Sequence, residues 1–214
     1  NLNLRFIFYS LDQDETLALI NCLGKINTLE KLSLQTYYGL PEALICLLKN
    51  LSALERFHAL DLMFGSTRMT TIPWMQWTQA LARLTHLQTF KLKVYVITSL
   101  FDDSLRRFQK SLASLPHLED LDITFEKFVP SKNITLLNFG KFIASSQTLK
   151  KLSFSILTLE RRYPQEIIDE FTLLLRKSPN IVSIQKIEIN HDPYSSQAIP
   201  IVEECESDLD EDKE

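Results

Sequence analysis

Histidines, cysteines and glycines are the residues with which this chain of 214 amino acids could do chemistry, and each type is scarce. A metal site needs several His, Cys or carboxylate ligands at close spacing, and a phosphate-binding loop needs glycines within a few positions of one another. Here both types are scattered: His58, His86, His117 and His191, and Gly24, Gly39, Gly65 and Gly140. We therefore predict no enzymatic activity, no metal site and no cofactor.

The cysteines show no pairing pattern either. Cys22, Cys46 and Cys205 lack both disulfide-like and metal-ligand spacing. Cys22 and Cys46 fall inside helical patterns, and we expect both to be small buried apolar residues. Unpaired cysteines indicate a reducing compartment. We expect a cytoplasmic protein, with a nuclear, cytoskeletal or ciliary location as alternatives.

Two pairs of charged residues are the first candidates for binding. Lys91 and Lys93 alternate along one segment, and Asp120 and Asp122 do so at the matching place in a later segment. Met63 matches the position of Lys93 in an earlier segment. In a strand, alternate side chains share one side, so the pairs would face the same way. This group is either a mixed-charge docking face for a protein or an ordinary solvated sheet face with cross-strand pairs.

Aromatic residues that follow these segments are the second candidates. Tyrosine and tryptophan often anchor protein interfaces, and here they recur where strands should lead into helices. The group consists of Tyr37, Tyr38, Trp74, Tyr95, Phe101, Phe128 and Tyr163. Of these we take Tyr37, Trp74, Tyr95 and Phe128 as candidate protein-binding residues. The alternative is that several of them fold back over the core.

A repeated apolar pattern would position both groups. Six segments carry apolar residues spaced as in Leu118-Glu-Asp-Leu121-Asp-Ile123, two of them with one extra three-residue step, and Leu2-Asn-Leu4 is similar to the end of a seventh. Their last apolar positions are 4, 34, 62, 92, 123, 154 and 189. A near-constant period of about 30 residues indicates a solenoid. Alternation inside each copy predicts a strand, and spacings of three and four between copies predict a helix.

These patterns lead to specific expectations for the elements. The last apolar residue of each copy should point into the core: Leu34, Leu62, Leu92, Ile123, Phe154 and Ile189. Apolar spacing predicts the third helix at 77–84 and the fifth at 136–144, the latter with Gly140 inside it. Alignment of the copies pairs Ser153 with Glu188 in the last two strands.

One strand and one helix per period resembles the leucine-rich repeat family, in the long, helix-bearing class typified by ribonuclease inhibitor. The resemblance covers residues 2–191. It implies an α/β, right-handed solenoid with a parallel sheet on the concave face and helices on the convex face. The family's usual Asn or Cys, three residues after the last leucine, is replaced by Tyr37, Gly65, Tyr95, Glu126, Leu157 and Asp192. The repeats are therefore degenerate.

The chain divides into three expected parts. Residues 1–191 form a solenoid of about six repeats, residues 192–202 a capping or extended segment, and residues 203–214 an acidic tail that should be solvated. The tail holds eight acidic residues and one lysine, whereas the rest holds 22 basic and 19 acidic residues. A body so close to neutral disfavours nucleic acid as a partner. A membrane is not expected either, because no run of 18 apolar residues is present.

The most consistent function is a non-catalytic protein–protein interaction module, a scaffold or adaptor that forms the C-terminal part of a larger protein or a subunit of a larger assembly. The apolar first strand, residues 2–9, should pack against further repeats, another domain or a subunit. Two alternatives stay open. One is a regulator similar to a GTPase-activating protein that joins such repeats to an acidic tail. The other is a binder of histones or other basic proteins through the tail.

Overall fold

Strands and helices alternate strictly along the chain. The computed structural model describes residues 2–8, 13–36, 41–66, 71–96, 102–126, 132–158 and 163–191. Within these ranges the strands are β1 (Leu2–Phe8), β2 (Leu29–Thr36), β3 (Ala59–Ser66), β4 (Thr89–Val96), β5 (Asp120–Glu126), β6 (Lys151–Thr158) and β7 (Ser183–His191). The helices are α1 (Gln13–Leu23), α2 (Pro41–Leu51), α3 (Thr71–Leu81), α4 (Asp102–Ala113), α5 (Asn133–Ala144) and α6 (Gln165–Arg176).

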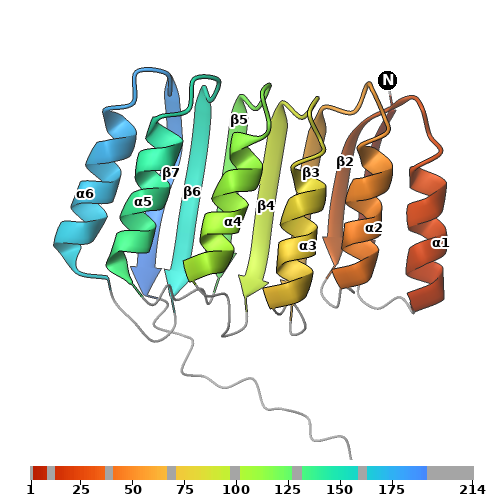
Figure 1. Cartoon of the computed structure of the whole chain (residues 1–214), viewed down its shortest axis with the longest axis horizontal. Helices are drawn as coiled ribbons and strands as arrows, with labels where there is room; N and C mark the ends of the chain where they lie inside the picture. The colour runs from red at the N-terminus through yellow and green to blue at the C-terminus, as the bar shows by residue number, and fades with distance from the viewer. Residues whose placement is uncertain are drawn as a thin grey trace, which may run out of the picture.

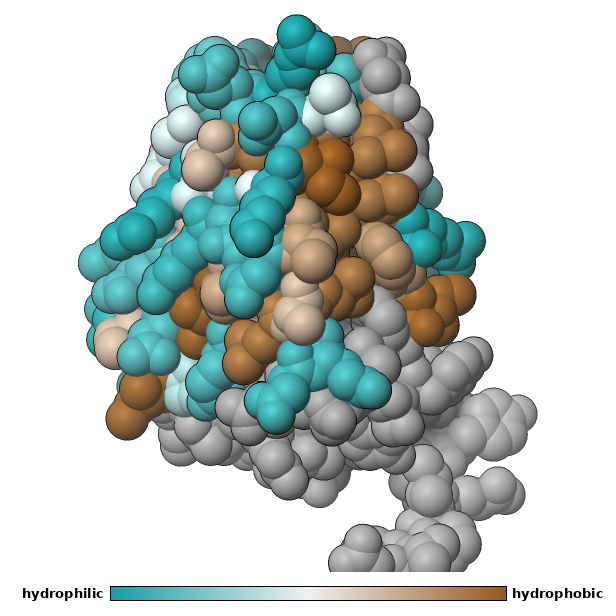
Figure 2. All heavy atoms as spheres, turned by 90° about the vertical axis from the view of Figure 1, so that its right-hand side faces the viewer, coloured by the Kyte–Doolittle hydropathy of each residue, from teal (hydrophilic) through white to brown (hydrophobic). Residues whose placement is uncertain are grey.

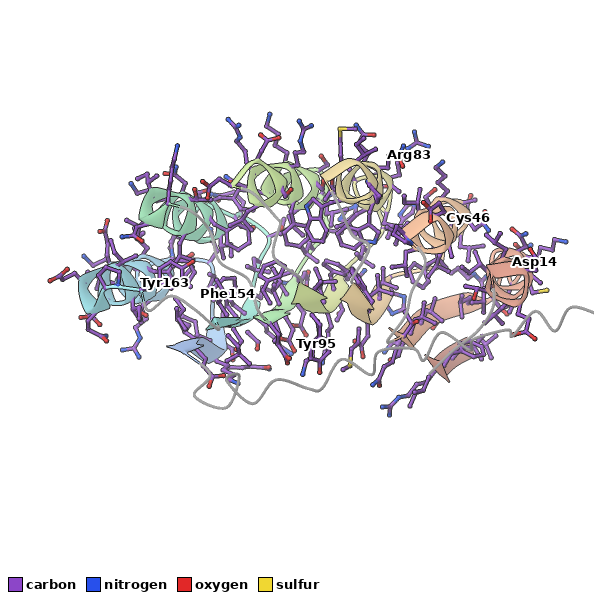
Figure 3. The ribbon with its side chains drawn as sticks, turned by 90° about the horizontal axis from the view of Figure 1, so that it is seen from below. Asp14, Cys46, Arg83, Tyr95, Phe154 and Tyr163 are labelled. Carbon is purple, nitrogen blue, oxygen red and sulfur yellow. The ribbon has the colours of Figure 1, made fainter. Side chains whose placement is uncertain are left out.

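The strands form one parallel sheet in chain order, β1-β2-β3-β4-β5-β6-β7. All helices cover one side of it (Figure 1). Seen along the strands, the molecule is an arc with the helices outside and the strands inside (Figure 3). This curvature follows from the spacings, because strands lie about 4.8 Å apart and packed helices about 8–10 Å apart. The expected α/β solenoid with a concave sheet is confirmed.

The core lies between the sheet and the helices. All six residues predicted to end each copy inside the core are buried, from Leu62 and Ile123 at 0% exposure to Ile189 at 8%. From α3 to α6 a run of contacting rings fills this space, stacked in the first contacts and tilted in the last two, made of Trp74, Trp77, Phe108, Phe139, Phe154 and Phe171. Figure 3 shows Phe154 pointing into this layer from the sheet. These large rings connect successive repeats into one core.

The third helix begins earlier than predicted. It spans Thr71–Leu81, whereas apolar spacing predicts 77–84. Pro73 lies in its first turn, where the missing N–H has no partner in a helix anyway. Trp74 and Trp77, three residues apart, then share the buried side of the helix. Pro73 and Trp74 therefore belong to α3 and not to the connection between β3 and α3.

The register of the last strand also differs from the prediction. A bulge between Leu152 and Ser153 shifts the pairing, so that Ser153 pairs with Lys186 and Ser155 with Glu188. The predicted pairing of Ser153 with Glu188 is wrong. The shift passes over Gln185 of β7, and a bulge of this kind leaves one extra residue of a strand unpaired.

The fifth helix starts at Asn133, three residues before the predicted position, and includes Gly140. A Cβ placed on Gly140 would lie 2.7 Å from Cδ2 of Phe171, a fully buried ring of α6. The glycine therefore allows α5 and α6 to approach closely.

The cysteines of the helices lie nearer the surface than expected. Cys22 is exposed and Cys46 is partly buried, so the prediction of two buried cysteines is wrong. Cys46 is 4.0 Å from the side-chain oxygen of Asn21 and 3.9 Å from the amide nitrogen of Asn50, distances typical of weak sulfur contacts.

Candidate functional site

The concave face is built from the alternate residues of each strand that point away from the helices. Strand pairing sets them in rows across the sheet. One row runs through Arg5, Ser33, Asp61, Lys91, Asp122, Ser153 and Lys186. Lys91 thus has Asp61 on one side and Asp122 on the other. The two predicted charge pairs do lie on neighbouring strands, β4 and β5. Lys91 is opposite Asp122, whereas Asp120 is opposite Thr89 and Lys93 is opposite Thr124.

Lys93 bonds along the sheet and not with the predicted aspartates. Its Nζ lies 2.7 Å from Oε1 of Glu126 and 5.1 Å from the ring centre of Tyr95. Burial acts to lower the pKa of Lys93, but hydrogen bonds to Glu126 and Tyr95 outweigh it and raise the pKa above its ordinary value. Figure 3 shows Tyr95 projecting from the sheet on the side away from the helices. Met63, partly buried, is opposite Lys93 on the next strand.

A hollow of about 340 Å³ opens on this face over β1 to β4. It is lined by the short, partly buried side chains of Ser33, Ala59 and Thr89 and by the exposed charged side chains of Arg5, Lys31, Lys91 and Asp61. Ser33 donates a hydrogen bond of 3.1 Å to the carboxylate of Asp61. Three cations around one carboxylate make the hollow electropositive.

Charge is divided between the two halves of the concave face. On β1 to β4 the charged side chains of the strand rows are Arg5, Lys31, Lys91 and Lys93 against Asp61. On β5 to β7 they are Asp120, Asp122, Glu126 and Glu188 against Lys151 and Lys186. The first half is net basic and the second net acidic. A ligand lying across the strands would meet basic side chains at one end and acidic side chains at the other.

The structure describes three residues of the predicted aromatic rim, Trp74, Tyr95 and Tyr163, and two of these three are buried. Trp74 is 1% exposed, and its Nε1 donates a hydrogen bond of 2.9 Å to the backbone oxygen of Ser104. Tyr163 is 6% exposed. Trp74 as a binding residue is therefore a wrong prediction, while Tyr95 does lie on the concave face. Tyr37, Tyr38, Phe101 and Phe128 lie outside the described residues.

Three histidines that are far apart in sequence come together at the edge where helices lead into strands. His58, His86 and His117 line one hollow of about 380 Å³ with Glu55 and Arg56. In the sequence these histidines are about one repeat apart, and because successive repeats stack side by side, residues at similar repeat positions lie close together. Within the described residues, no three His, Cys, Asp or Glu side chains are placed so that they could hold a metal. None of the described helices has the length and apolar character needed to cross a bilayer.

Comparison with known proteins gives a likeness in structure and none in sequence. No family model matches the chain, and no curated protein does. Among solved structures, one titled Leiomodin-1 Actin-Binding Site 2 aligns with a TM-score of 0.54 and 14% identity, over 79% of this chain and 91% of that one. The fold is a leucine-rich-repeat-type solenoid. At this identity the likeness concerns the fold, and such solenoids present their surfaces as protein-interaction modules.

Proposed function

We propose that this solenoid is a non-catalytic scaffold or adaptor of the ribonuclease-inhibitor-like class, and that it binds a protein along its concave face. The observation that carries the proposal is the division of charge between the two halves of the concave face, basic on β1 to β4 and acidic on β5 to β7. Side chains on a hydrogen-bonded sheet are held at fixed spacing, so a partner meets a preorganised surface. Seven strands at about 4.8 Å span roughly 30 Å, which is wide enough for a protein interface.

The charges define the partner's chemistry. Its acidic side chains would lie over the hollow lined by Arg5, Lys31 and Lys91, and its basic side chains over Asp120 and Asp122. Complementary charge of this kind fixes the orientation of a complex and raises the association rate more than it raises affinity. Because Leiomodin-1 carries an actin-binding site on a similar fold, actin is the first defined protein to test.

A charge-reversal experiment tests the face. The variant Lys31→Glu/Lys91→Glu should lose most binding to a partner captured by the wild type. The control Lys25→Glu/Lys49→Glu changes net charge equally, at exposed positions away from the sheet face, and should keep it. Quantitative capture with both variants, followed by actin co-sedimentation, gives the readout. Equal loss in both variants, or in neither, would rule out the concave face as the binding surface.

The two alternative functions make different predictions. A binder of histones or other basic proteins through the tail would lose its partner on deletion of residues 203–214. Its binding would also fall steeply with salt, because exposed charges are screened beyond about 8 Å at physiological ionic strength. A regulator of the GTPase-activating class would accelerate GTP hydrolysis by a captured GTPase. Capture that survives tail deletion, without any such acceleration, supports the scaffold proposal.

We also propose that the N-terminal end of the array packs against further repeats, another domain or a subunit. Figure 2 shows apolar side chains gathered over the β1 side of this end and polar ones over α1. Leu2, Leu4 and Phe6 are partly buried and Ile7 is 43% exposed. Sedimentation of the 214-residue chain tests this, with self-association expected. A monomer with slow amide exchange in β1 would contradict it.

A further inference from the structure

A second, separate groove lies on the convex side between α4 and α5. Its volume is about 670 Å³, and its lining includes the apolar side chains of Leu105 and Phe142. Its walls carry the cations Arg106, Lys110, Lys132 and Lys141, against one acidic residue, Asp102. The groove is therefore basic, on a face that the concave binding surface does not include.

Most of this charge is not neutralised within the groove. Arg106 pairs with Asp103 of its own helix at 2.6 Å. Lys110, Lys132 and Lys141 are exposed, and among the described residues they form no ion pair. Like charges around one groove repel each other, so an anionic occupant would relieve that repulsion. The occupant should carry several carboxylates along an extended segment.

The chain itself contains such a segment. We propose that the acidic tail, residues 203–214, lies in the groove between α4 and α5 of the same molecule. Its eight acidic residues and one lysine match the basic lining. This replaces the freely solvated tail expected from sequence, and it does not rest on the proposed concave-face function.

The geometry of the chain allows this placement. The C-terminal end of β7 and the N-terminal ends of α4 and α5 lie along the same edge of the molecule (Figure 1). β7 and β5 are separated by β6, so about 10 Å must be crossed along the sheet, and about 10 Å more to the helical layer. Residues 192–202 can span at most about 36–40 Å when extended. A tether of this length gives an effective concentration near millimolar.

The concave face is a worse place for the tail. To reach the basic hollow over β1 to β4 from β7, it would cross the net acidic half of the face, where Asp120, Asp122, Glu126 and Glu188 outnumber Lys151 and Lys186. Repulsion between like charges opposes that path, whereas the path along the helix N-termini leads directly to Lys132. The groove between α4 and α5 is therefore the preferred intramolecular site.

A paramagnetic label on the tail tests the proposal. Cys205 lies in the tail, and Cys22→Ser/Cys46→Ser leaves it as the single thiol of the full chain. A nitroxide on Cys205 should broaden the amide signals of α4 and α5 at low salt. The broadening should be lost at 1 M salt, where charges are screened beyond about 3 Å. Broadening centred on β1 to β4, or broadening nowhere, would overturn the proposal.

Two further samples make the assignment specific. Lys110→Glu/Lys141→Glu should abolish the broadening, while Lys25→Glu/Lys49→Glu, with the same change in net charge, should retain it. An equal effect of both variants would mean that net charge alone holds the tail, and would contradict the groove. A mixture of nitroxide-labelled protein with separate isotope-labelled protein should show no broadening. Broadening in that mixture would assign the contact to a second molecule and overturn the intramolecular site.

Discussion

Gly140 illustrates how one residue sets the distance between two helices. A methyl group there would overlap the Phe171 ring, with 2.7 Å between Cβ and Cδ2. Alanine favours a helix over glycine by about 1 kcal/mol, but overpacking a tight core costs about 1–3 kcal/mol. Because Phe171 is fully buried and cannot swing into solvent, we expect Gly140→Ala to lower the free energy of unfolding by about 1 kcal/mol in urea titrations.

The companion measurement is a double-mutant cycle with Phe171→Leu. If the overlap is the cause, Gly140→Ala should cost less, or even stabilise, once the ring is gone. Strict additivity of the two changes would show that the glycine serves another purpose.

Lys93 gives a pH-dependent prediction at the same scale. Its pKa is raised in the folded state, so its contribution to stability is fully present below its unfolded pKa of about 10.4. That contribution is lost as pH rises through the folded pKa. The stability difference between wild type and Lys93→Met should be about 0.2–1 kcal/mol, as for exposed ion pairs. Urea titrations should show it constant between about pH 7 and 10 and smaller above. In a Glu126→Gln background this pH dependence should largely vanish.

Single side chains mark the limit of inference from this sequence. Lys91 and Asp122 could be placed opposite each other because alternation and a constant period fix rows across a parallel sheet. Trp74 and Tyr95 could not be told apart, because both come after the last apolar residue of a copy and both have large rings, yet Tyr95 lies within β4 and Trp74 within α3. Burial of Trp74 depends on where α3 begins, and exposure of Cys22 on which side of α1 has a neighbour. Neither can be read from spacing alone.

Helix α3 carries a matched pair of tryptophans that separates packing from hydrogen bonding. Trp74 and Trp77 are both buried, and their rings stack at 5.0 Å. Trp74 donates to the backbone oxygen of Ser104, whereas Nε1 of Trp77 has no hydrogen-bond partner among the described atoms. Replacing either by phenylalanine leaves a similar cavity, but Trp74→Phe also removes a hydrogen bond to a buried backbone oxygen. We expect Trp74→Phe to cost about 0.5–1.5 kcal/mol more.

Urea unfolding of the two variants provides the comparison. A greater cost for Trp77→Phe would mean that ring packing, and not the hydrogen bond to Ser104, dominates this part of the core.

Whole elements were more predictable than their ends. Existence and order of the strands and helices follow from the two apolar periods, which are strong over this many copies. The start of α3 was hidden because Pro73 usually marks a connection, yet it is compatible with a first helical turn. The register of β7 was hidden because apolar spacing alone does not show that a bulge passes over Gln185.

Cooperativity of the array can be tested at its middle strand. Leu121 lies in β5 at 2% exposure, with β4 and β6 on either side. A carboxylate there would be buried without a partner, which costs several kcal/mol, and neighbouring repeats depend on each other for stability. Leu121→Asp should therefore unfold the array or lower its melting temperature strongly by circular dichroism. Thr124→Asp adds the same charge to β5 on the concave face and should have little effect. An unchanged melting temperature for Leu121→Asp would contradict the register.

The strict chain order of the sheet has a mechanical consequence. Each strand pairs only with its sequence neighbours, so a pull between residues 2 and 191 runs along the inter-strand hydrogen bonds and loads the strand pairs in series. Under such a load the hydrogen bonds between strands break one after another from one end. In strands pulled in shear, by contrast, they would resist the force together. In an optical trap the array should lengthen in small steps at low force and refold when the force is released. A molecule built this way behaves as a soft spring between whatever its two ends are attached to.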